Sequence, residues 1–106
     1  MSYGGVNSKA EDSRPQRVLV VDDDKALRIH ACTVLKTSGF EVCEAASGAE
    51  ALAQLRRENV DAVLLDIRMP GMDGFETCRR IRELRRGEFL PVIVVTGHGD
   101  MQAVEA

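Results

Sequence analysis

The chain has 106 residues, of which 44% are hydrophobic and 29% charged, and its formal net charge is −3. This length fits one globular domain, and the composition is typical of a soluble folded chain. No apolar run approaches the ~18 residues that a transmembrane helix needs. The N-terminus has no basic region followed by an apolar run, so no signal peptide is predicted. We therefore expect a cytoplasmic protein.

Residues 1–15 are predicted to be a disordered leader, because they contain two glycines, three serines and a proline, and few apolar residues. The folded domain is predicted over residues 16–106. Within it, short apolar runs alternate with amphipathic helical patterns. Strands are predicted at 18–21, 40–45, 62–66 and 91–96. Helices are predicted from Asp24 to Gly39, from Ser47 through Leu55 and from Asp73 to about Arg86, with a last one from Asp100 to the end of the sequence.

The helical patterns also predict which side chains face the sheet. In the first helix the stripe is Leu27, Ala31, Val34, Leu35 and Ser38. Ser47 and Glu50 form a capping box at the second helix, whose inward residues are Ala51, Leu52 and Leu55. Asp73 and Glu76 are a similar capping pair, and Phe75, Cys78 and Ile81 are expected to be buried. Gly39 and Gly87 are predicted to end their helices.

Two groups of residues are predicted to be structural. The odd cysteine count and the absence of a zinc spacing favour free buried thiols, with a redox role as the alternative. The arginines near the third helix are interspersed with glutamates and not with aromatic residues, which favours a solvated face and no direct nucleic-acid binding. These residues are Cys32, Cys43 and Cys78, and Arg79, Arg80, Arg82, Arg85 and Arg86.

The alternation of strands and helices predicts an α/β fold, a doubly wound parallel sheet with helices on both faces. In such sheets, ligands bind at the carboxyl ends of the strands. Asp22 and Asp23 follow the first strand, Asp66 ends the third, and Thr96 ends the fourth. Clustered carboxylates repel one another, and a bound divalent cation removes the conflict. Mg²⁺ suits such oxygen ligands and leaves room for a phosphate.

Each of these residues also has a simpler explanation. Asp22, Asp23 and Asp24 could cap the helix that follows, which is the interpretation we prefer for Asp24. Asp66 could cap a loop, and Thr96 could be an ordinary strand end. Their joint arrangement at one edge favours the metal site.

The motifs at these strand ends resemble those of the receiver domains of bacterial two-component response regulators. The resemblance covers residues 17–106 and implies a flavodoxin-like sheet with strand order 2-1-3-4. Its most specific part is the Asp-x-x-Met-Pro-x-Met-Asp-Gly run that begins at Asp66. The matching segments are 20–23 (VVDD), 65–74 (LDIRMPGMDG) and 91–97 (PVIVVTG).

The resemblance implies a signalling switch and not a turnover enzyme. Asp66 would be the phosphoacceptor, receiving the group from a sensor histidine kinase or phosphotransfer protein. Asp23 and Asp66 would hold Mg²⁺ directly, and Asp22 through a water. The backbone carbonyl of Arg68 would complete the metal shell, and Thr96 would be the switch hydroxyl. A downstream output domain or partner would read the switch.

Two histidines and one arginine side chain have open roles. In similar domains the positions of Arg68 and His98 border the path of the hydrolytic water, so either could tune phosphate lifetime; the alternative is solvent exposure. We expect His30 on the surface of a helix, without a phosphorelay role.

The sequence departs from the family pattern at its end. The fifth strand and helix of the family are not matched, and no lysine follows Lys36 to pair with the phosphoryl group. We therefore expect weaker or less stable phosphorylation. We also expect a bare apolar edge at the fourth strand, which would allow a homodimer or a domain-swapped assembly.

Two alternatives to the phosphoacceptor switch remain. One is an interaction module of the same fold that is never phosphorylated. The other is a phosphohydrolase of the haloacid-dehalogenase kind, whose Asp-x-Asp motif Asp22 and Asp24 would mimic. Ala26 stands where that enzyme has Thr or Val, which disfavours it. The output, whether a cyclic-dinucleotide enzyme or a transcription factor, is open.

Overall fold

The computed structural model describes residues 14–67, 74–95 and 101–103. They form one five-stranded sheet in the order β2-β1-β3-β4-β5, with three helices. The elements in chain order are β1 (Arg17–Val21), α2 (Lys25–Thr37), β2 (Glu41–Ala45), α3 (Gly48–Arg57), β3 (Ala62–Asp66), α4 (Gly74–Leu84), β4 (Val92–Val95) and β5 (Met101–Ala103).

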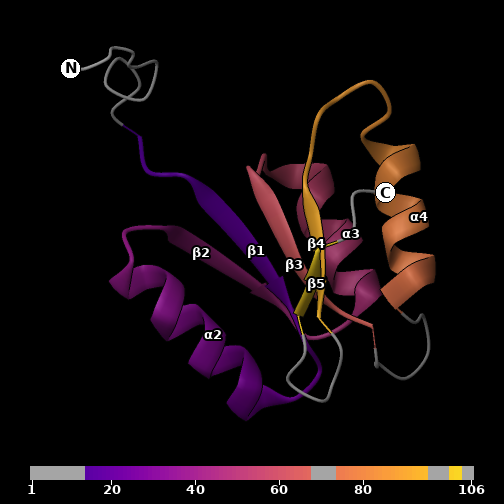
Figure 1. Cartoon of the computed structure of the whole chain (residues 1–106). Helices are drawn as coiled ribbons and strands as arrows, with labels where there is room; N and C mark the ends of the chain where they lie inside the picture. Colours follow the sequence, from indigo (N-terminus) through magenta and orange to yellow (C-terminus); the bar gives the residue numbers. More distant parts are fainter. Residues whose placement is uncertain (1–13, 68–73, 96–100, 104–106) are drawn as a thin grey trace.

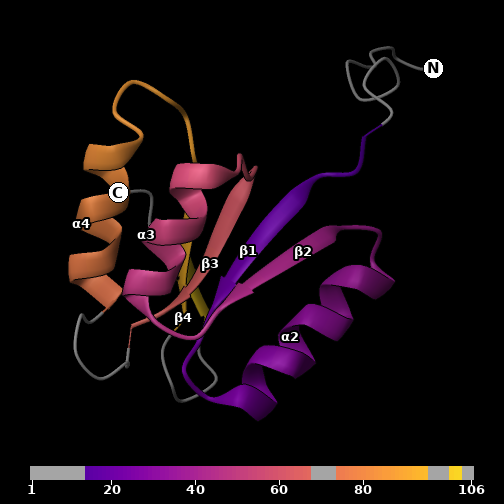
Figure 2. The same ribbon diagram turned by 180° about the vertical axis from the view of Figure 1, so that it is seen from behind.

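The helices lie on both faces of the sheet. Figures 1 and 2 show α2 alone on one face, against β1 and β2, and α3 beside α4 on the other. Strands β1 to β4 are all parallel. The doubly wound architecture and the strand order 2-1-3-4 are therefore confirmed. No helix in the described part of the chain is both long enough and apolar enough to cross a bilayer.

The interior strand β1, between β2 and β3, divides the hydrophobic core into two layers. Leu19 and Val21 pack with α3 and α4, whereas Val18 and Val20 pack with Cys32 of α2. This alternation follows from the two-residue period of a strand. Because all four residues are buried, β1 is fixed from both sides.

The helix ends follow the sequence closely. Asp24 caps α2, its carboxylate accepting the Leu27 N–H at 3.1 Å, and Ser47 caps α3 by accepting the Glu50 N–H at 3.1 Å. The Glu50 carboxylate accepts the N–H of Ala46, one residue earlier than a standard capping box would have it. Gly39 and Gly87 have φ of 99° and 87°, so both take the left-handed conformation expected at these helix ends.

The predicted inward stripe of α2 is partly wrong. Leu27 and Val34 are 53% and 49% exposed, and the buried residue is Cys32. Ala31 and Leu35 do pack against the core layer of Val18, Val20 and Cys32, so the buried face of α2 is rotated toward Cys32. The stripe failed because a small thiol was not counted among the apolar anchors.

The prediction for α4 failed at one position. Phe75 is 63% exposed, whereas Cys78 and Ile81 are buried as expected. Thr77 is fully buried. The buried residues of α4 are therefore Gly74 and those three, four and seven positions after it, which is the spacing of one helix face. A small polar residue thus occupies the inner face, and the aromatic ring lies outside it.

The end of the described chain also differs from expectation. Residues 101–103 form strand β5, antiparallel to β4, where a helix was predicted. Its register sets Met101 opposite Val95, which covers the β4 edge. The predicted bare edge is therefore wrong, because the backbone groups of β4 find partners within the chain. The predicted pairing of this edge with a second copy of the chain depended on an unpaired β4, and β5 now occupies that edge. Asp100 and Asp73 lie outside the described residues.

The cysteines are free, as predicted: Cys32 and Cys78 are buried and Cys43 is partly buried. Burial raises the pKa of all three thiols. A protonated thiol is a poor nucleophile, which argues against the redox alternative.

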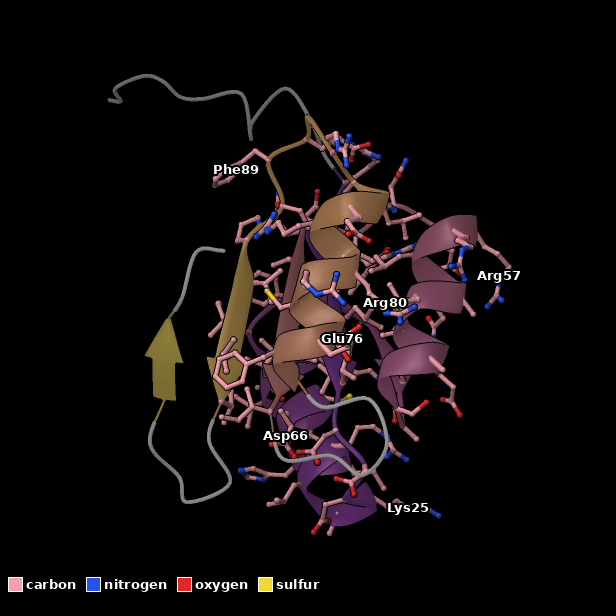
Figure 3. All side chains as sticks on the ribbon, turned by 90° about the vertical axis from the view of Figure 1, so that its right-hand side faces the viewer. Lys25, Arg57, Asp66, Glu76, Arg80 and Phe89 are labelled. Atoms are coloured by element: carbon pink, nitrogen blue, oxygen red, sulfur yellow. The ribbon has the colours of Figure 1, made fainter. Side chains whose placement is uncertain are left out.

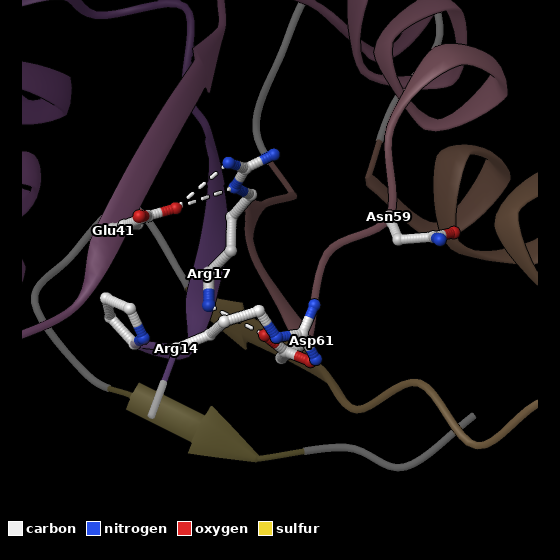
Figure 4. Close-up of a pocket in the computed structure, with 6 residues that line it drawn as sticks. Arg14, Arg17, Glu41, Asn59 and Asp61 are labelled. Carbon is white, nitrogen blue, oxygen red and sulfur yellow. Dashed lines mark hydrogen bonds and ion pairs between the residues drawn. The ribbon is translucent and has the colours of Figure 1, made fainter. Parts of the chain in front are cut away.

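Arg17 ties the amino end of the sheet together. Its backbone N–H donates to the Asp61 carboxylate at 2.7 Å, and its guanidinium pairs with Glu41 at 2.9 Å and Glu58 at 3.3 Å. Figure 4 shows this residue in a hollow of about 490 Å³. The charges in this hollow pair with one another across β1, β2 and the α3–β3 connection.

Arg85 was predicted to lie on a solvated face but is only 8% exposed. Its guanidinium donates to the carbonyl oxygens of Leu55 and Glu58, both at 2.7 Å, and pairs with Glu88 at 3.1 Å. The last carbonyls of a helix lack intrahelical donors and carry partial negative charge. Arg85 therefore caps the carboxyl end of α3 from the end of α4.

Replacing Arg85 should weaken the fold. In Arg85→Met the buried Leu55 carbonyl and the partly buried Glu58 carbonyl lose their charged donor, so we expect a loss of about 2 kcal/mol in the free energy of unfolding. Urea denaturation followed by circular dichroism measures it. The exposed neighbour provides the control, since Arg86→Met should stay within about 0.5 kcal/mol of wild type. Equal stability of both variants would contradict the capping role.

Candidate functional site

The register of β1 and β3 brings three carboxylates together. Val21 pairs with Leu65, so the residues that follow, Asp22 and Asp66, lie at the ends of neighbouring parallel strands. One oxygen from each of Asp22, Asp23 and Asp66 lies within 4.8 Å of the others. Figure 3 shows Asp66 beside the start of α4, at the carboxyl end of the sheet.

Hydrogen bonds fix the turn between β1 and α2. The Asp22 N–H donates to the Ala45 carbonyl at 3.1 Å, and the Asp22 carboxylate accepts the Asp24 N–H at 2.9 Å. The guanidinium of Arg28 donates to the Asp22 carbonyl at 2.7 Å and pairs with Glu44 at 2.9 Å. Asp22 is thus held through its backbone as well as its side chain.

The clustering perturbs Asp22 strongly. The pKa of its carboxyl is raised from 3.8 to about 6, chiefly by burial and also by the charge of Asp66, a hydrogen bond to Asp66 and the charge of Asp23. The Asp24 N–H acts in the opposite direction. At neutral pH the carboxylates of Asp22, Asp23 and Asp66 therefore repel one another.

The donor set fits a hard divalent cation. All three side chains offer carboxylate oxygens, Asp22 and Asp66 are partly buried, and Asp23 is exposed to solvent. Mg²⁺ takes a few carboxylates and keeps several waters, which suits an open site of this kind. Among the residues that the structure describes, no other group of His, Cys, Asp or Glu has this geometry.

Gly74 sets the distance between α4 and the end of β3. Its N–H donates to the Ile67 carbonyl at 3.3 Å. A Cβ added at Gly74 would clash with the Cα of Ile67 and lie 2.7 Å from its Cγ2. Glycine is needed here for close approach of the backbone, one residue beyond Asp66.

The structure thus unites Asp22, Asp23 and Asp66, as the sequence predicted, and assigns Asp24 to the cap of α2. Thr96, Arg68 and His98 lie outside the described residues, so their roles stay predictions. His30 is exposed on α2, as expected. The sequence reasoning missed one supporting residue, Arg28, which nothing in the sequence pattern marks. Gly74 belongs to the motif segment 65–74 and was expected to shape the loop, but its close approach to Ile67 is seen only in the structure.

Comparison with known proteins gives the family. Residues 18–106 match the family described as the response regulator receiver domain. This chain belongs to that family.

Curated relatives agree with this assignment. The chain is 42% identical over 83 residues to the transcriptional regulatory protein AfsQ1 of Streptomyces coelicolor, and the alignment covers 78% of this chain and 36% of that protein. It is 34% identical to the sporulation initiation phosphotransferase F of Bacillus subtilis, covering 85% of this chain and 71% of that protein. The chain therefore spans about a third of the first curated relatives it matches, 36% of AfsQ1 and 35% of the Mycobacterium response regulator MprA.

Solved structures agree as well. The response regulator TrrA of Thermotoga maritima, solved in complex with Mg²⁺ and BeF, aligns with a TM-score of 0.73 at 36% identity, covering 78% of this chain and 70% of that chain. Membership of the receiver family argues against the haloacid-dehalogenase alternative.

The electrostatic conflict at Asp22 predicts a pH-dependent stability. Because its folded pKa is raised, the native state favours the protonated carboxyl, and this contribution is lost as pH rises from about 4 through about 6. With EDTA present at pH 8, Asp22→Asn should therefore be more stable than wild type by about 1 kcal/mol, after allowance for solvent screening. The difference should shrink toward pH 4. Urea denaturation across pH measures it, and a pH-independent difference would contradict this account.

The close approach at Gly74 predicts a steric cost. Gly74→Ala should lower the free energy of unfolding by about 1–3 kcal/mol, because the Ile67 backbone must move. Thermal or urea unfolding measures the change. An alanine variant as stable as wild type would show that the contact is not restrictive.

Proposed function

We propose that this receiver domain accepts a phosphoryl group on the carboxylate of Asp66, in a reaction that uses Mg²⁺ held by Asp22, Asp23 and Asp66. The observation that carries the proposal is the meeting of these three carboxylates within 4.8 Å at the carboxyl edge of the sheet. The donor would be a phosphohistidine on a sensor histidine kinase or phosphotransfer protein.

In the proposed reaction, an oxygen of Asp66 attacks phosphorus in line as the bond from phosphorus to the imidazole nitrogen breaks. The electron pair of that bond stays with the imidazole, and the product is an acyl phosphate on Asp66. When bound, Mg²⁺ supplies positive charge against the phosphoryl oxygens. Asp66 is positioned by β3, whose Val63 and Leu65 are fully buried. Asp22 is held by the β1–α2 turn, so the acceptor and its acidic neighbours are preorganised.

Further support comes from chemistry and from the relatives. The pKa of Asp22 is raised by burial and by its acidic neighbours, and a bound cation would offset both effects on its charged form. The TrrA structure was solved in complex with Mg²⁺ and BeF. In this proposal the Arg68 carbonyl would complete the metal shell, and the Thr96 hydroxyl would bond a phosphoryl oxygen and transmit the switch.

The partners of the whole protein follow as part of the proposal. The relative AfsQ1 is named as a transcriptional regulatory protein, which supports a transcriptional output over a cyclic-dinucleotide enzyme. A histidine kinase signals to such a regulator inside the cell, so we infer a cytoplasmic location.

The test is intact-mass spectrometry after incubation with Mg²⁺ and acetyl phosphate. We expect one phosphoryl adduct on the wild type, none in EDTA and none on Asp66→Asn. The matched control is Asp24→Asn, which keeps a helix cap of equal quality and should still form the adduct. An adduct that persists on Asp66→Asn would place the acceptor elsewhere. No adduct on wild type, despite measured Mg²⁺ binding, would favour the interaction module that is never phosphorylated.

A further inference from the structure

A second charged surface lies at the end of the molecule opposite the aspartates. The carboxyl ends of α3 and α4 and the turn that leads to β4 form two hollows of about 370 and 360 Å³. The two hollows share Arg85 and Glu88, so they adjoin across the end of α4. We call this surface the basic groove. Its charged lining residues are Arg56, Arg57, Arg82, Arg85, Arg86, Glu58 and Glu88.

The basic groove has an excess of positive charge, part of which is not neutralised by ion pairs among the described residues. Five arginines against two glutamates give it a formal charge of +3, in a chain whose net charge is −3. The described residues include no ion pair for Arg56, Arg57 or Arg86. Arginines elsewhere are paired: Arg17 with Glu41 and Glu58, Arg28 with Glu44, and Arg79 and Arg80 with Glu76.

Helix capping does not account for these side chains. Basic residues often lie in the last turn of a helix because they offset its dipole. At α3, however, the carbonyls of Leu55 and Glu58 already accept hydrogen bonds from Arg85. Arg56 and Arg57 therefore keep their charge and donors directed to solvent. Figure 3 shows Arg57 on the outer side of α3.

Apolar side chains border the same groove. Phe89 lies in the α4–β4 turn and is 82% exposed, the most exposed large hydrophobic residue in the described part of the chain. Leu84, at the end of α4, is 36% exposed. Figure 3 shows Phe89 projecting away from the sheet, at the end of the molecule opposite Asp66. Exposed aromatic and arginine side chains together are typical of binding surfaces.

We propose that the basic groove binds an extended acidic segment of a partner protein. Carboxylates of the segment would pair with Arg56, Arg57 and Arg86, and an apolar side chain would cover Phe89. The glutamates Glu58 and Glu88 favour a peptide over a nucleic acid, because a peptide can leave gaps between its charges and a phosphate backbone cannot. Arg85 is already engaged by α3 and serves as the floor of the groove.

This binding is separate from phosphoryl transfer. The groove contains none of Asp22, Asp23 or Asp66, and it lies at the amino ends of the strands. A partner bound there would leave the acceptor accessible to a kinase. The groove would hold a partner next to the receiver domain, whether or not Asp66 carries a phosphoryl group.

The experiment measures fluorescence anisotropy of a labelled peptide of about ten residues that alternates glutamate and leucine, ~33 Å long when extended. The full chain in EDTA should bind it, and should not bind the version with glutamine in place of glutamate. Arg57→Gln/Arg86→Gln should weaken binding about 5-fold, since each exposed pair contributes modestly. Phe89→Ser should also weaken it.

The matched control is Lys25→Gln/Lys36→Gln, which removes the same charge from α2, on the other side of the sheet. It should leave the dissociation constant unchanged. The proposal is overturned if both double variants weaken binding equally, since that shows a net-charge effect. It is also overturned if no acidic peptide binds at low salt, or if a single-stranded oligonucleotide of equal charge binds more tightly. Circular dichroism would verify that each variant is folded.

Discussion

The parallel pairing of β1 with β3 in one fixed register is the constraint on which the functional site depends. Val21 opposite Leu65 puts the next residues, Asp22 and Asp66, side by side at the same edge. A slip of one residue would move Asp66 by about 3.3 Å and turn it to the other face of the sheet. The register is held by fully buried neighbours such as Leu19 and Val63. The positions of Asp22 and Asp66 at the strand ends therefore depend on the packing of the buried residues within β1 and β3.

The same arrangement creates a tension between fold and function. Buried strands position the carboxylates, and burial, together with the nearby charges of Asp66 and Asp23, raises the cost of ionising Asp22. Burial of each large apolar side chain stabilises the fold by about 1.5–3 kcal/mol, so the core outweighs this cost. Proteins commonly keep such local conflicts where function requires them. Here the conflict is confined to the strand ends, where solvent and a cation can reach it.

Much of this could be predicted from the sequence, because the signals were local. Apolar runs that end in aspartate placed Asp22, Asp23 and Asp66 at one edge, and Asp24 and Ser47 marked helix starts. The failures involve tertiary context. Arg85 looks like any other arginine in a basic segment, and only the position of α3 shows that its guanidinium is buried. Phe75 was predicted to be buried together with Cys78 and Ile81, yet Thr77 occupies the inner face. The β5 strand depends on the unpaired edge of β4, which a local helix pattern cannot reveal.

The buried guanidinium of Arg85 has a consequence for how the domain opens. It belongs to the end of α4 but satisfies the last carbonyls of α3, while Ile81 and Leu55 share the same core layer. Fraying of either helix end would expose the Arg85 charge and leave the last carbonyls of α3 without a hydrogen-bond donor. The two helices are thus joined into one cooperative unit, which in native-state hydrogen exchange would open together. The α2 layer on the other side of the sheet has a smaller core and several half-exposed apolar residues, so we expect it to be a separate and less protected unit.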